Sequence, residues 1–289
     1  MKATNGLLKK IPKLLFLLAA PFLLAALWLL FAISGIWWKL RRALAPPHPP
    51  RTAEPVEPPR FASVVIPNWN GKDLLEKYLP PLLAACREGD EIIVVDNAST
   101  DGSAEYIEHN YPRVRVLRQQ RNLGFGGGSN AGIAAAKHPV AILLNNDMRV
   151  VPGFVEALLA GFTRSDVFGV SAQIFFSDPQ KRREETGLTA GQFQKGFIRV
   201  RHVIDDSIQS IYPTLYAGGG STAYDREKFL AIGGFDPLFE PFYLEDTDLS
   251  FNAWRRGWSV LYQPAAHVFH EHRGTIGKHF TPEAISAFL

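Results

Sequence analysis

The stretch Glu91-Ile-Ile-Val-Val-Asp-Asn-Ala-Ser-Thr-Asp-Gly102 decides the fold of this chain. After Glu91, residues 92–95 form a continuous apolar and β-branched run, which is typical of a strand that is buried on both faces. The run stops abruptly at Asp96, and a polar turn follows it. Such strands occur in parallel sheets that are covered by helices, so the stretch predicts an α/β protein.

The same pattern recurs on both sides of this stretch. Short apolar runs at residues 62–66, 114–117 and 140–144 predict three further strands. Residues 71–86 have helical spacing, and this alternation of strand and helix predicts βαβ units in a mainly parallel sheet. Because the carboxyl ends of parallel strands meet at one edge, the polar residues that end these strands predict a ligand crevice there.

The second half of the chain is less regular. An apolar run at residues 167–176 precedes a charged stretch at 177–185, which we interpret as a solvated loop. A glycine run at 218–220 leads into a predicted strand that ends at Tyr224. A helix is predicted over residues 245–256, because carboxylates begin it and Gly257 follows it.

The N-terminal part is apolar enough to enter a membrane. Residues 14–38 carry no charged side chain and exceed the roughly 20 residues that a helix needs to cross a bilayer core. Basic residues flank the segment on both sides, so they leave its orientation open. A cleavable signal peptide with the small-x-small site Ala43-Leu44-Ala45 is the alternative. Pro21 also leaves open a kink, or a segment that returns to the same side.

These patterns divide the chain into six predicted segments. They are a basic N-terminal segment at 1–13, a transmembrane or membrane-embedded anchor at 14–38, a proline-rich linker at 39–60, the two halves of the α/β domain at 61–165 and 166–277, and a C-terminal segment at 278–289 that starts like a helix and ends without a cap, as a truncated end would.

Composition excludes two classes of protein. The chain has 31 Lys and Arg against 28 Asp and Glu, a net charge of +3, and no basic stripe, so nucleic acid is not an expected partner. The single cysteine, Cys86, excludes an internal disulfide framework and a cysteine-based zinc site, and it fits a reducing compartment.

Two polar motifs are suited to binding a nucleotide, but each also has a purely structural explanation. Asp96 could accept a hydrogen bond from a ribose or base, and a polar turn with a helix cap explains the same residues equally well. The glycines of Asn122-Leu-Gly-Phe-Gly-Gly-Gly-Ser-Asn130 would let backbone approach a ligand, with a helix starting near Ser129. This segment lacks the Gly-Lys-Ser/Thr of a Walker loop, and a flexible turn is its alternative.

Other polar groups suit a cation or a proton transfer. Asp147 follows Asn145 and Asn146, and such an oxygen-rich cluster suits Mg²⁺ or Mn²⁺, although a capping aspartate is the alternative. Glu245-Asp-Thr-Asp248 places three acids in four residues, which is more than a helix cap needs. Histidines at 267, 270 and 272 follow an apolar strand, where a lone histidine is more often structural.

Five motifs, in this order and spacing, resemble those of the inverting family 2 glycosyltransferases of GT-A fold. They are Val65-Ile-Pro-Asn-Trp-Asn-Gly71, Val94-Val-Asp-Asn-Ala-Ser-Thr-Asp-Gly-Ser103, Asn122-Leu-Gly-Phe-Gly-Gly-Gly-Ser-Asn-Ala-Gly132, Leu144-Asn-Asn-Asp147 and Glu245-Asp-Thr-Asp248. The resemblance covers residues 61–277 and is strongest to the bacterial rhamnosyl- and galactofuranosyl-type branch. It implies a GT-A fold with a mainly parallel central sheet, in which residues 61–165 bind the nucleotide sugar and residues 166–277 bind the acceptor and catalyse transfer.

The resemblance also implies roles for single residues. Asp246 would be the general base, and Asp147 and His270 would bind Mg²⁺ or Mn²⁺, with His272 as the competing histidine. Only the last acid of the family's Asp-x-Asp motif is present, because Asn145 occupies the first position. The residues expected to bind the nucleotide sugar are Pro67, Asn68, Asn70, Asp96, Asn122, Gly126, Asn130 and Asn146, with Glu245 on the acceptor side.

The implied reaction moves a hexose or deoxyhexose from a dTDP-, UDP- or GDP-linked donor to a membrane-associated glycan or lipid-linked acceptor during cell-surface polysaccharide synthesis. The implied location is the cell membrane, with the catalytic domain on the cytoplasmic side. A glycoside hydrolase would leave the first three motifs unexplained. A membrane-tethered nucleotide- or sugar-binding module without catalysis is the remaining alternative.

Overall fold

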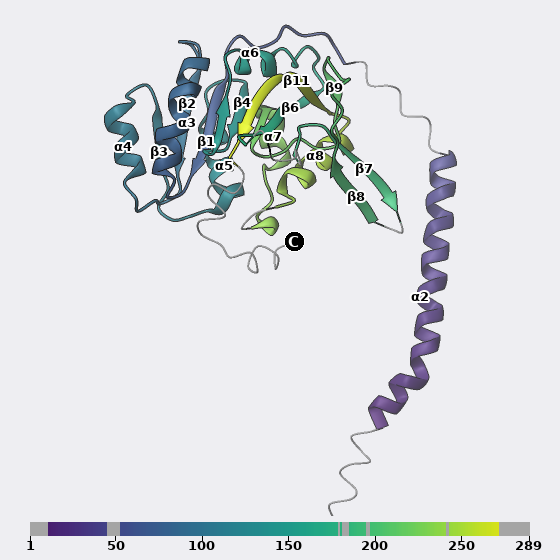
Figure 1. Cartoon of the computed structure of the whole chain (residues 1–289). Helices are drawn as coiled ribbons and strands as arrows, with labels where there is room; N and C mark the ends of the chain where they lie inside the picture. The colour runs from purple at the N-terminus through teal and green to yellow at the C-terminus, as the bar shows by residue number, and fades with distance from the viewer. Residues whose placement is uncertain are drawn as a thin grey trace, which may run out of the picture. The chain divides into compact units, whose positions relative to one another are not determined.

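The computed structural model describes residues 11–44, 53–178, 180, 185–194, 197–240 and 243–271 (Figure 1). The chain has two compact units, Met1–Thr52 and Ala53–Leu289. Within the first unit, helix α2 (Ile11–Leu44) runs through Pro21 without interruption. Among the described residues, its part Leu18–Arg41 is long and apolar enough to cross a membrane, with a mean hydropathy of 2.2. A signal sequence near the N-terminus has the same properties, so this helix alone is weak evidence for a membrane span.

The predicted linker at 39–60 has structure at both ends. Residues 39–44 belong to α2. On the other side, Pro55 bridges Arg164, and the backbone N–H of Val56 donates to the carbonyl of Thr163 over 2.9 Å. Only residues 45–52 of the predicted linker lie outside the described part of the chain, so the second unit begins earlier than residue 61.

The second unit is built around one large sheet with the strand order β3-β2-β1-β4-β10-β6-β11-β5, and β9 pairs with β11. Its strands are β1 (Ser63–Asn68), β2 (Glu91–Asp96), β3 (Arg115–Arg118), β4 (Val140–Leu144), β5 (Met148–Val150), β6 (Val167–Phe176), β9 (Tyr212–Pro213), β10 (Ser221–Asp225) and β11 (Ser259–His270). A separate two-stranded sheet consists of β7 (Thr189–Gln194) and β8 (Phe197–His202). The pairs β3–β2, β2–β1, β1–β4 and β6–β11 are parallel, whereas β4–β10, β10–β6, β5–β11 and β9–β11 are antiparallel. Most of the paired residues belong to parallel pairs, which confirms the mainly parallel sheet.

Helices connect and cover these strands (Figure 1). They are α3 (Lys72–Ala85), α4 (Ser103–Asn110), α5 (Gly124–Ala135), α6 (Phe154–Leu159), α7 (Arg226–Ile232), α8 (Glu245–Arg255) and the 3₁₀ turn η1 (Pro237–Phe239). The four strands predicted in the first half form at or within one or two residues of the predicted places, and three of them, β1, β2 and β4, are apolar runs that the sheet buries almost completely. The weakest of them, β3, lies at the sheet edge and is only partly buried.

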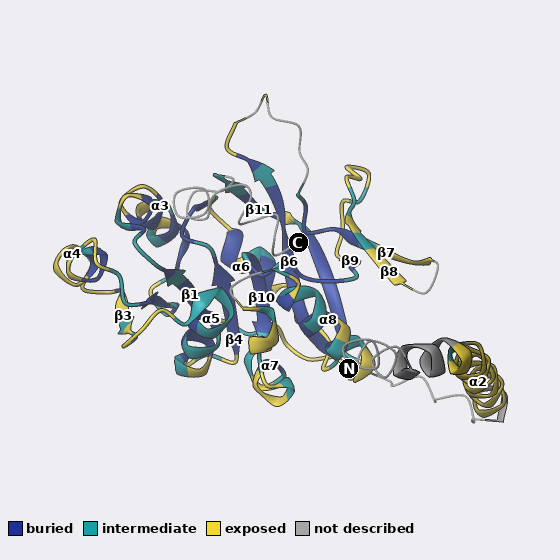
Figure 2. Ribbon diagram, turned by 90° about the horizontal axis from the view of Figure 1, so that it is seen from below, coloured by how far each residue is buried: buried dark blue, intermediate teal, exposed yellow. Residues whose placement is uncertain are grey.

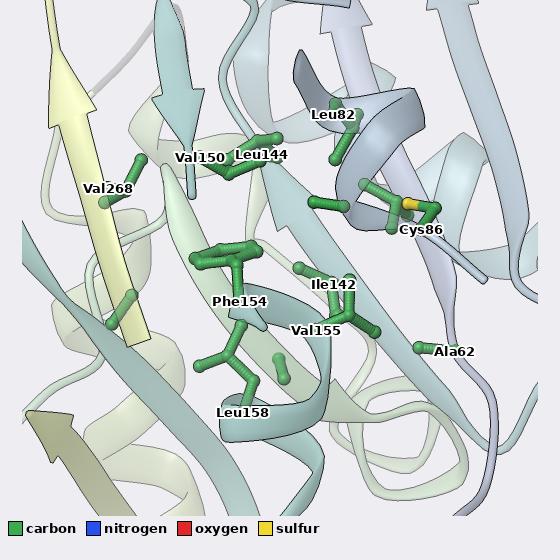
Figure 3. Close-up of a cluster of buried hydrophobic side chains, with 14 of the residues drawn as sticks. Ala62, Leu82, Cys86, Ile142, Leu144, Val150, Phe154, Val155, Leu158 and Val268 are labelled. Atoms are coloured by element: carbon green, nitrogen blue, oxygen red, sulfur yellow. The ribbon is translucent and has the colours of Figure 1, made fainter. Parts of the chain in front are cut away.

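Buried apolar side chains lie on both faces of the sheet. One cluster includes Leu82 from α3, Cys86 directly after this helix, and Phe154 and Leu158 from α6 (Figure 3). The other contains Tyr224 with Phe229 and Phe235, whose rings meet at centroid distances of 5.3–6.3 Å. Figure 2 shows the central strands buried and the outer surfaces of the helices exposed. The sheet is therefore a rigid platform for the residues at its strand ends.

Helix α5 lies unusually close to the sheet. A Cβ placed on Gly132 would stand 2.3 Å from Cγ1 of Val65, and one placed on Gly128 would stand 2.5 Å from Nδ2 of Asn97. Only glycine permits this approach. The glycine-rich segment was predicted to be a loop with a helix starting near Ser129, and this prediction was wrong: α5 begins at Gly124. Packing against β1 and β2 outweighs the low helix propensity of glycine.

Candidate active site

The carboxyl ends of the parallel strands meet, as their register requires. Asn68 at the end of β1 is paired with Asp96 at the end of β2. The side-chain Oδ1 of Asn68 accepts a hydrogen bond from Nδ2 of Asn146 over 2.7 Å, and its Nδ2 donates to Oγ of Ser103 over 3.0 Å. The ends of β1 and β4 and the start of α4 are thus held together at one edge of the sheet.

A cavity of about 460 Å³ lies at this edge. Such a volume lies within the usual range for small-molecule and cofactor sites. Its lining comes from strand ends, from the first residues of α5 and α8, and from β8. The lining residues are Pro67, Asn68, Trp69, Asn97, Asn122, Gly124, Phe125, Asn145, Asn146, Asp147, Met148, Ile174, Glu185, Val200, His202, Tyr216, Gly218, Gly219, Gly220, Tyr243, Leu244, Glu245, Asp246, Thr247 and His270.

Asp147 and His270 meet in this cavity because β11 pairs with β5, with His270 opposite Met148. Nε2 of His270 lies 3.4 Å from Oδ1 of Asp147, and its Nδ1 lies 2.8 Å from Oε2 of Glu185. Burial lowers the pKa of His270, but the two carboxylates outweigh burial and raise it to about 10. Asp147 is 6% exposed, and its buried Oδ1 has no hydrogen-bond partner among the residues described. An acidic oxygen and an imidazole nitrogen are therefore aimed at the same space.

A second set of contacts fixes the end of β11. The backbone N–H of Glu271 donates to the carbonyl of Asp147 over 2.9 Å. The Glu271 carboxylate accepts from Nζ of Lys77 over 2.6 Å and from the hydroxyl of Tyr78. Helix α3 thus holds the residue next to His270. Sequence reasoning singled out none of the residues Lys77, Tyr78, Glu185 and Glu271, because only the fold brings them to this strand end.

Asp246 and Glu245 form the opposite carboxylate cluster of the cavity, at the first turn of α8. Oδ2 of Asp246 accepts from the backbone N–H of Gly219 over 3.1 Å, and its Oδ1 accepts from that of Thr247 over 2.6 Å. Burial raises the pKa of Asp246 even against these hydrogen bonds. Burial, together with the neighbouring Asp246 charge, also raises the pKa of Glu245 to about 7. Two carboxyl groups of raised pKa in one cavity are a common feature of proton-transfer sites.

The residues predicted for nucleotide-sugar binding separate into two groups. Pro67, Asn68, Asn122 and Asn146 line the cavity, whereas Asn70, Asp96, Gly126 and Asn130 are not among its lining residues. Asp96 is 4% exposed and leaves Oδ1 without a partner in the described part of the chain, one residue before the lining residue Asn97. Asn70 has a φ of 49°, and its Oδ1 accepts from the backbone N–H of Thr100 over 2.7 Å, which joins the loop after β1 to the loop after β2.

Asn130 has a structural contact that explains its position away from the cavity. Its Nδ2 donates to the carbonyl of Phe235 over 2.9 Å, and its Oδ1 accepts from the backbone N–H of Phe235 over 2.9 Å. Both polar atoms of the side-chain amide thus join α5 to the segment before η1. His272, the competing histidine, lies outside the described residues, as does the predicted segment 278–289.

Comparison with known proteins places this geometry in a family. The model of the family "Glycosyl transferase family 2" matches residues 63–229. An uncharacterized protein of Sinorhizobium fredii, y4gI, is 26% identical over 82% of this chain and 27% of its own length. N-acetylglucosaminyl-diphospho-decaprenol L-rhamnosyltransferase of Mycobacterium tuberculosis is 28% identical over 71% of this chain and 74% of its own length. The chain therefore spans about a quarter of one relative and about three quarters of the other.

Solved structures share the fold. GalNAc-T7 with UDP, GalNAc and Mn²⁺ superposes with a TM-score of 0.62 at 22% identity, covering 74% of this chain and 44% of that one. The mannosyltransferase PcManGT of Pyrobaculum calidifontis with GDP-Man and Mn²⁺ has a TM-score of 0.56 at 18% identity, covering 85% and 66%. These similarities confirm the expected GT-A fold. Because the family model also covers more than half of its length, the chain belongs to glycosyl transferase family 2.

Proposed function

We propose that this protein is a metal-dependent inverting glycosyltransferase, which transfers a hexose or deoxyhexose from a nucleotide sugar to a membrane-associated glycan or lipid-linked acceptor in cell-surface polysaccharide synthesis. The observation that carries the proposal is the placement of Asp246 in the same cavity as the Asp147–His270 pair. A proton acceptor and a cation site are the two protein groups that this chemistry needs in one cavity.

Asp246 is the base in this proposal. The acceptor oxygen forms a bond to the anomeric carbon while the bond from that carbon to the diphosphate oxygen breaks, and the hydroxyl proton passes to Asp246. The nucleoside diphosphate leaves with the bonding electrons. A raised pKa makes Asp246 a stronger base than an ordinary aspartate, and the N–H groups of Gly219 and Thr247 hold its carboxylate in place. Attack on the face opposite the leaving group inverts the anomeric configuration.

Asp147 and His270 are the proposed ligands of a divalent cation. The buried Oδ1 of Asp147 accepts no hydrogen bond from the described residues and lies 3.4 Å from Nε2 of His270, so the two atoms fit a shared cation, and His270 would release its Nε2 proton on binding one. The described residues contain no group of three or more His, Cys, Asp or Glu side chains suited to a metal, so donor phosphate oxygens and water would supply the remaining ligands. When bound, Mg²⁺ or Mn²⁺ would offset the charge of the leaving diphosphate.

Several observations support the choice of donor and acceptor. The similar structures hold UDP with GalNAc, or GDP-Man, and Mn²⁺. The name of the mycobacterial relative describes rhamnosyl transfer to a diphospho-decaprenol acceptor. Helix α2 would anchor the chain in the cell membrane, with the catalytic unit on the cytoplasmic side, where nucleotide sugars are made. The proposed donors are therefore dTDP-, UDP- or GDP-linked sugars.

The test is donor binding and turnover by the full chain. Nucleotide sugars would be screened by thermal shift with Mn²⁺, Mg²⁺ or chelator, and the product of the best donor would be followed by nucleoside diphosphate release with a lipid-linked acceptor. Metal-dependent stabilisation by one donor, together with turnover, is the expected result. Binding without any turnover would instead favour a membrane-tethered binding module, and no binding at all would refute both.

A further inference from the structure

The hairpin of β7 and β8 carries exposed apolar side chains that the proposed reaction does not use. Phe193 and Phe197 are each 73% exposed and Ile198 is 51% exposed. They lie at the turn end of the hairpin, which projects from the body of the second unit in Figure 1 and is largely exposed in Figure 2. Soluble surfaces seldom gather large apolar side chains in this way unless another apolar surface covers them.

The strand register connects this apolar end to the cavity. Phe193 is paired with Ile198, Gly191 with Val200, and Thr189 with His202. Paired residues share a face of a hairpin, and alternate residues along a strand lie on the same face, so Phe193, Ile198, Val200 and His202 lie on one face. Val200 and His202 line the cavity. One face of the hairpin therefore runs from exposed apolar side chains to the candidate active site.

The opposite face carries Phe197 together with two basic residues. Arg199 and Arg201 alternate with the residues of the apolar face and are exposed. The strands themselves contain no acidic residue, and Asp205 and Asp206 come only after β8 has ended at His202. Exposed aromatic and aliphatic side chains beside arginines suit the boundary of an anionic bilayer, where the rings enter the headgroup layer and the guanidinium groups contact lipid phosphates.

The connector between α2 and the second unit is short enough to keep this unit near a bilayer that α2 enters. Eight residues separate Leu44, the last residue of α2, from Ala53. An extended connector of this length spans at most about 30 Å. If α2 enters a membrane, as the proposed function holds, the second unit is tethered near the surface of that membrane and the exposed hairpin encounters it at a high effective concentration.

We propose that the end of the β7–β8 hairpin, formed by Phe193, Phe197 and Ile198, inserts into the headgroup region of the bilayer, with Arg199 and Arg201 contacting anionic lipid phosphates. This inference rests on the proposed function, because it explains how a lipid-linked acceptor meets the cavity. The sugar end of such an acceptor lies at the membrane surface, and the face that carries Val200 and His202 leads from that surface to Asp246.

The test uses the full chain reconstituted in phosphatidylcholine vesicles with or without phosphatidylglycerol. An environment-sensitive fluorophore is attached at Gln194→Cys on the hairpin and, as the matched control, at His109→Cys at the exposed end of α4. Burial raises the pKa of Cys86 to about 12, so the native thiol does not compete for the label. Quenching by nitroxide-labelled lipids then reports contact with acyl chains.

We expect a blue-shifted emission and quenching by lipid at position 194 but not at 109. The double variant Phe193→Ser/Ile198→Ser should lose both signals, and Arg199→Gln/Arg201→Gln should weaken them mainly in the vesicles that contain phosphatidylglycerol. An aqueous emission at both positions would overturn the proposal. A blue shift without lipid quenching would also overturn it, because it would show that protein covers the hairpin.

Failure of this inference can be told apart from failure of the proposed function. Nucleotide-sugar binding is measured by thermal shift on the same reconstituted samples. Lipid contact without any donor binding would support membrane insertion of the hairpin and refute the proposed glycosyltransferase function. Donor binding with a label that stays in water would support the proposed function and refute the insertion. None of the four substituted side chains lines the cavity, so donor binding by the variants should equal that of the wild type.

Discussion

The imidazole of His270 and the carboxylate of Asp147 face each other across the junction of β11 and β5, with 3.4 Å between Nε2 and Oδ1. The contact joins residues 123 positions apart in the sequence, and the hydrogen bond from the N–H of Glu271 to the carbonyl of Asp147 keeps the two strand ends in register. Because the carboxylate also raises the pKa of His270, the pair responds as a unit to the loss of either member.

Asp147→Asn should abolish metal-dependent binding while leaving the fold intact. The amide keeps the shape of the side chain but removes the charge that attracts a divalent cation. We expect the Mn²⁺-dependent thermal shift with UDP or dTDP to disappear and turnover to fall by at least ~100-fold. Glu88→Gln, an exposed acid outside the cavity, is the control. An undiminished Mn²⁺-dependent shift in Asp147→Asn would remove this residue from the proposed cation site.

Asp246→Asn should lose transfer without losing donor binding. The amide oxygen can still accept from Gly219 or Thr247, but the group can no longer take the acceptor proton. Loss of a general base lowers turnover by about 10²- to 10⁴-fold. Asp248→Asn is the matched control, since this residue lies in the same turn of α8 and contacts Asn252 rather than the cavity. Equal turnover in the two variants would show that Asp246 is not the base.

Glu245→Gln should stabilise the protein in a pH-dependent way. The folded state raises the pKa of Glu245 from 4.5 to about 7, so between these values the folded chain keeps a proton that the unfolded chain has lost. Stability of the wild type therefore falls as pH rises through this window, and the full loss is present above pH 7. It amounts to at most about 3 kcal/mol. Glutamine has no charge to bury and removes this loss.

Chemical denaturation at pH 5 and pH 8 measures the effect. The free-energy difference between Glu245→Gln and the wild type should grow in favour of the variant by up to about 3 kcal/mol between the two pH values. Glu88→Gln, at an exposed position, is the control variant for this comparison. A difference that is constant with pH would mean that burial does not shift the pKa of Glu245.

Asn130→Ala should weaken the fold rather than the binding of donor. The change leaves the backbone N–H and carbonyl of Phe235 without their side-chain partner, which costs about 1–3 kcal/mol. Donor affinity, measured by titration below the melting temperature, should stay close to that of the wild type. Asn122→Ala is the contrasting variant, since Asn122 lines the cavity. A larger loss of affinity in Asn130→Ala than in Asn122→Ala would reassign Asn130 to the donor site.

The parallel half of the sheet was predicted well from the sequence, because each of those strands is an apolar run with a polar end. The apolar run indicates a buried strand, and the polar end indicates where that strand leaves the core. The proximity of Asp147 and His270 also agrees with the sequence analysis, because the resemblance assigned both strand-end residues to one metal site; the metal-binding role itself stays a prediction. The sequence pattern alone could not have placed these two residues together, because nothing in either segment indicates that β11 pairs with β5.

Other parts of the site had no sequence signal. Glu185 stands in a charged stretch that resembles any solvated loop, and only the fold brings it to 2.8 Å from Nδ1 of His270. The β7–β8 hairpin was missed because its residues alternate weakly between polar and apolar types. The start of α5 was misplaced because glycine has a low helix propensity, which is the only signal that the local sequence offers. In the folded chain the close contact of Gly132 with Val65 and Val95 favours the helix instead.

Gly128 and Gly132 affect the width of the cavity, although neither residue lines it. The first turn of α5 forms one wall of the cavity, and the separation between this helix and the sheet sets where that wall stands. We expect a methyl group at either glycine to push α5 away from the sheet. Gly124 and Phe125 would move with the helix, and the cavity would become wider. If the cavity binds the donor, as proposed, the missing side chains of Gly128 and Gly132 help to set the space that is left for it.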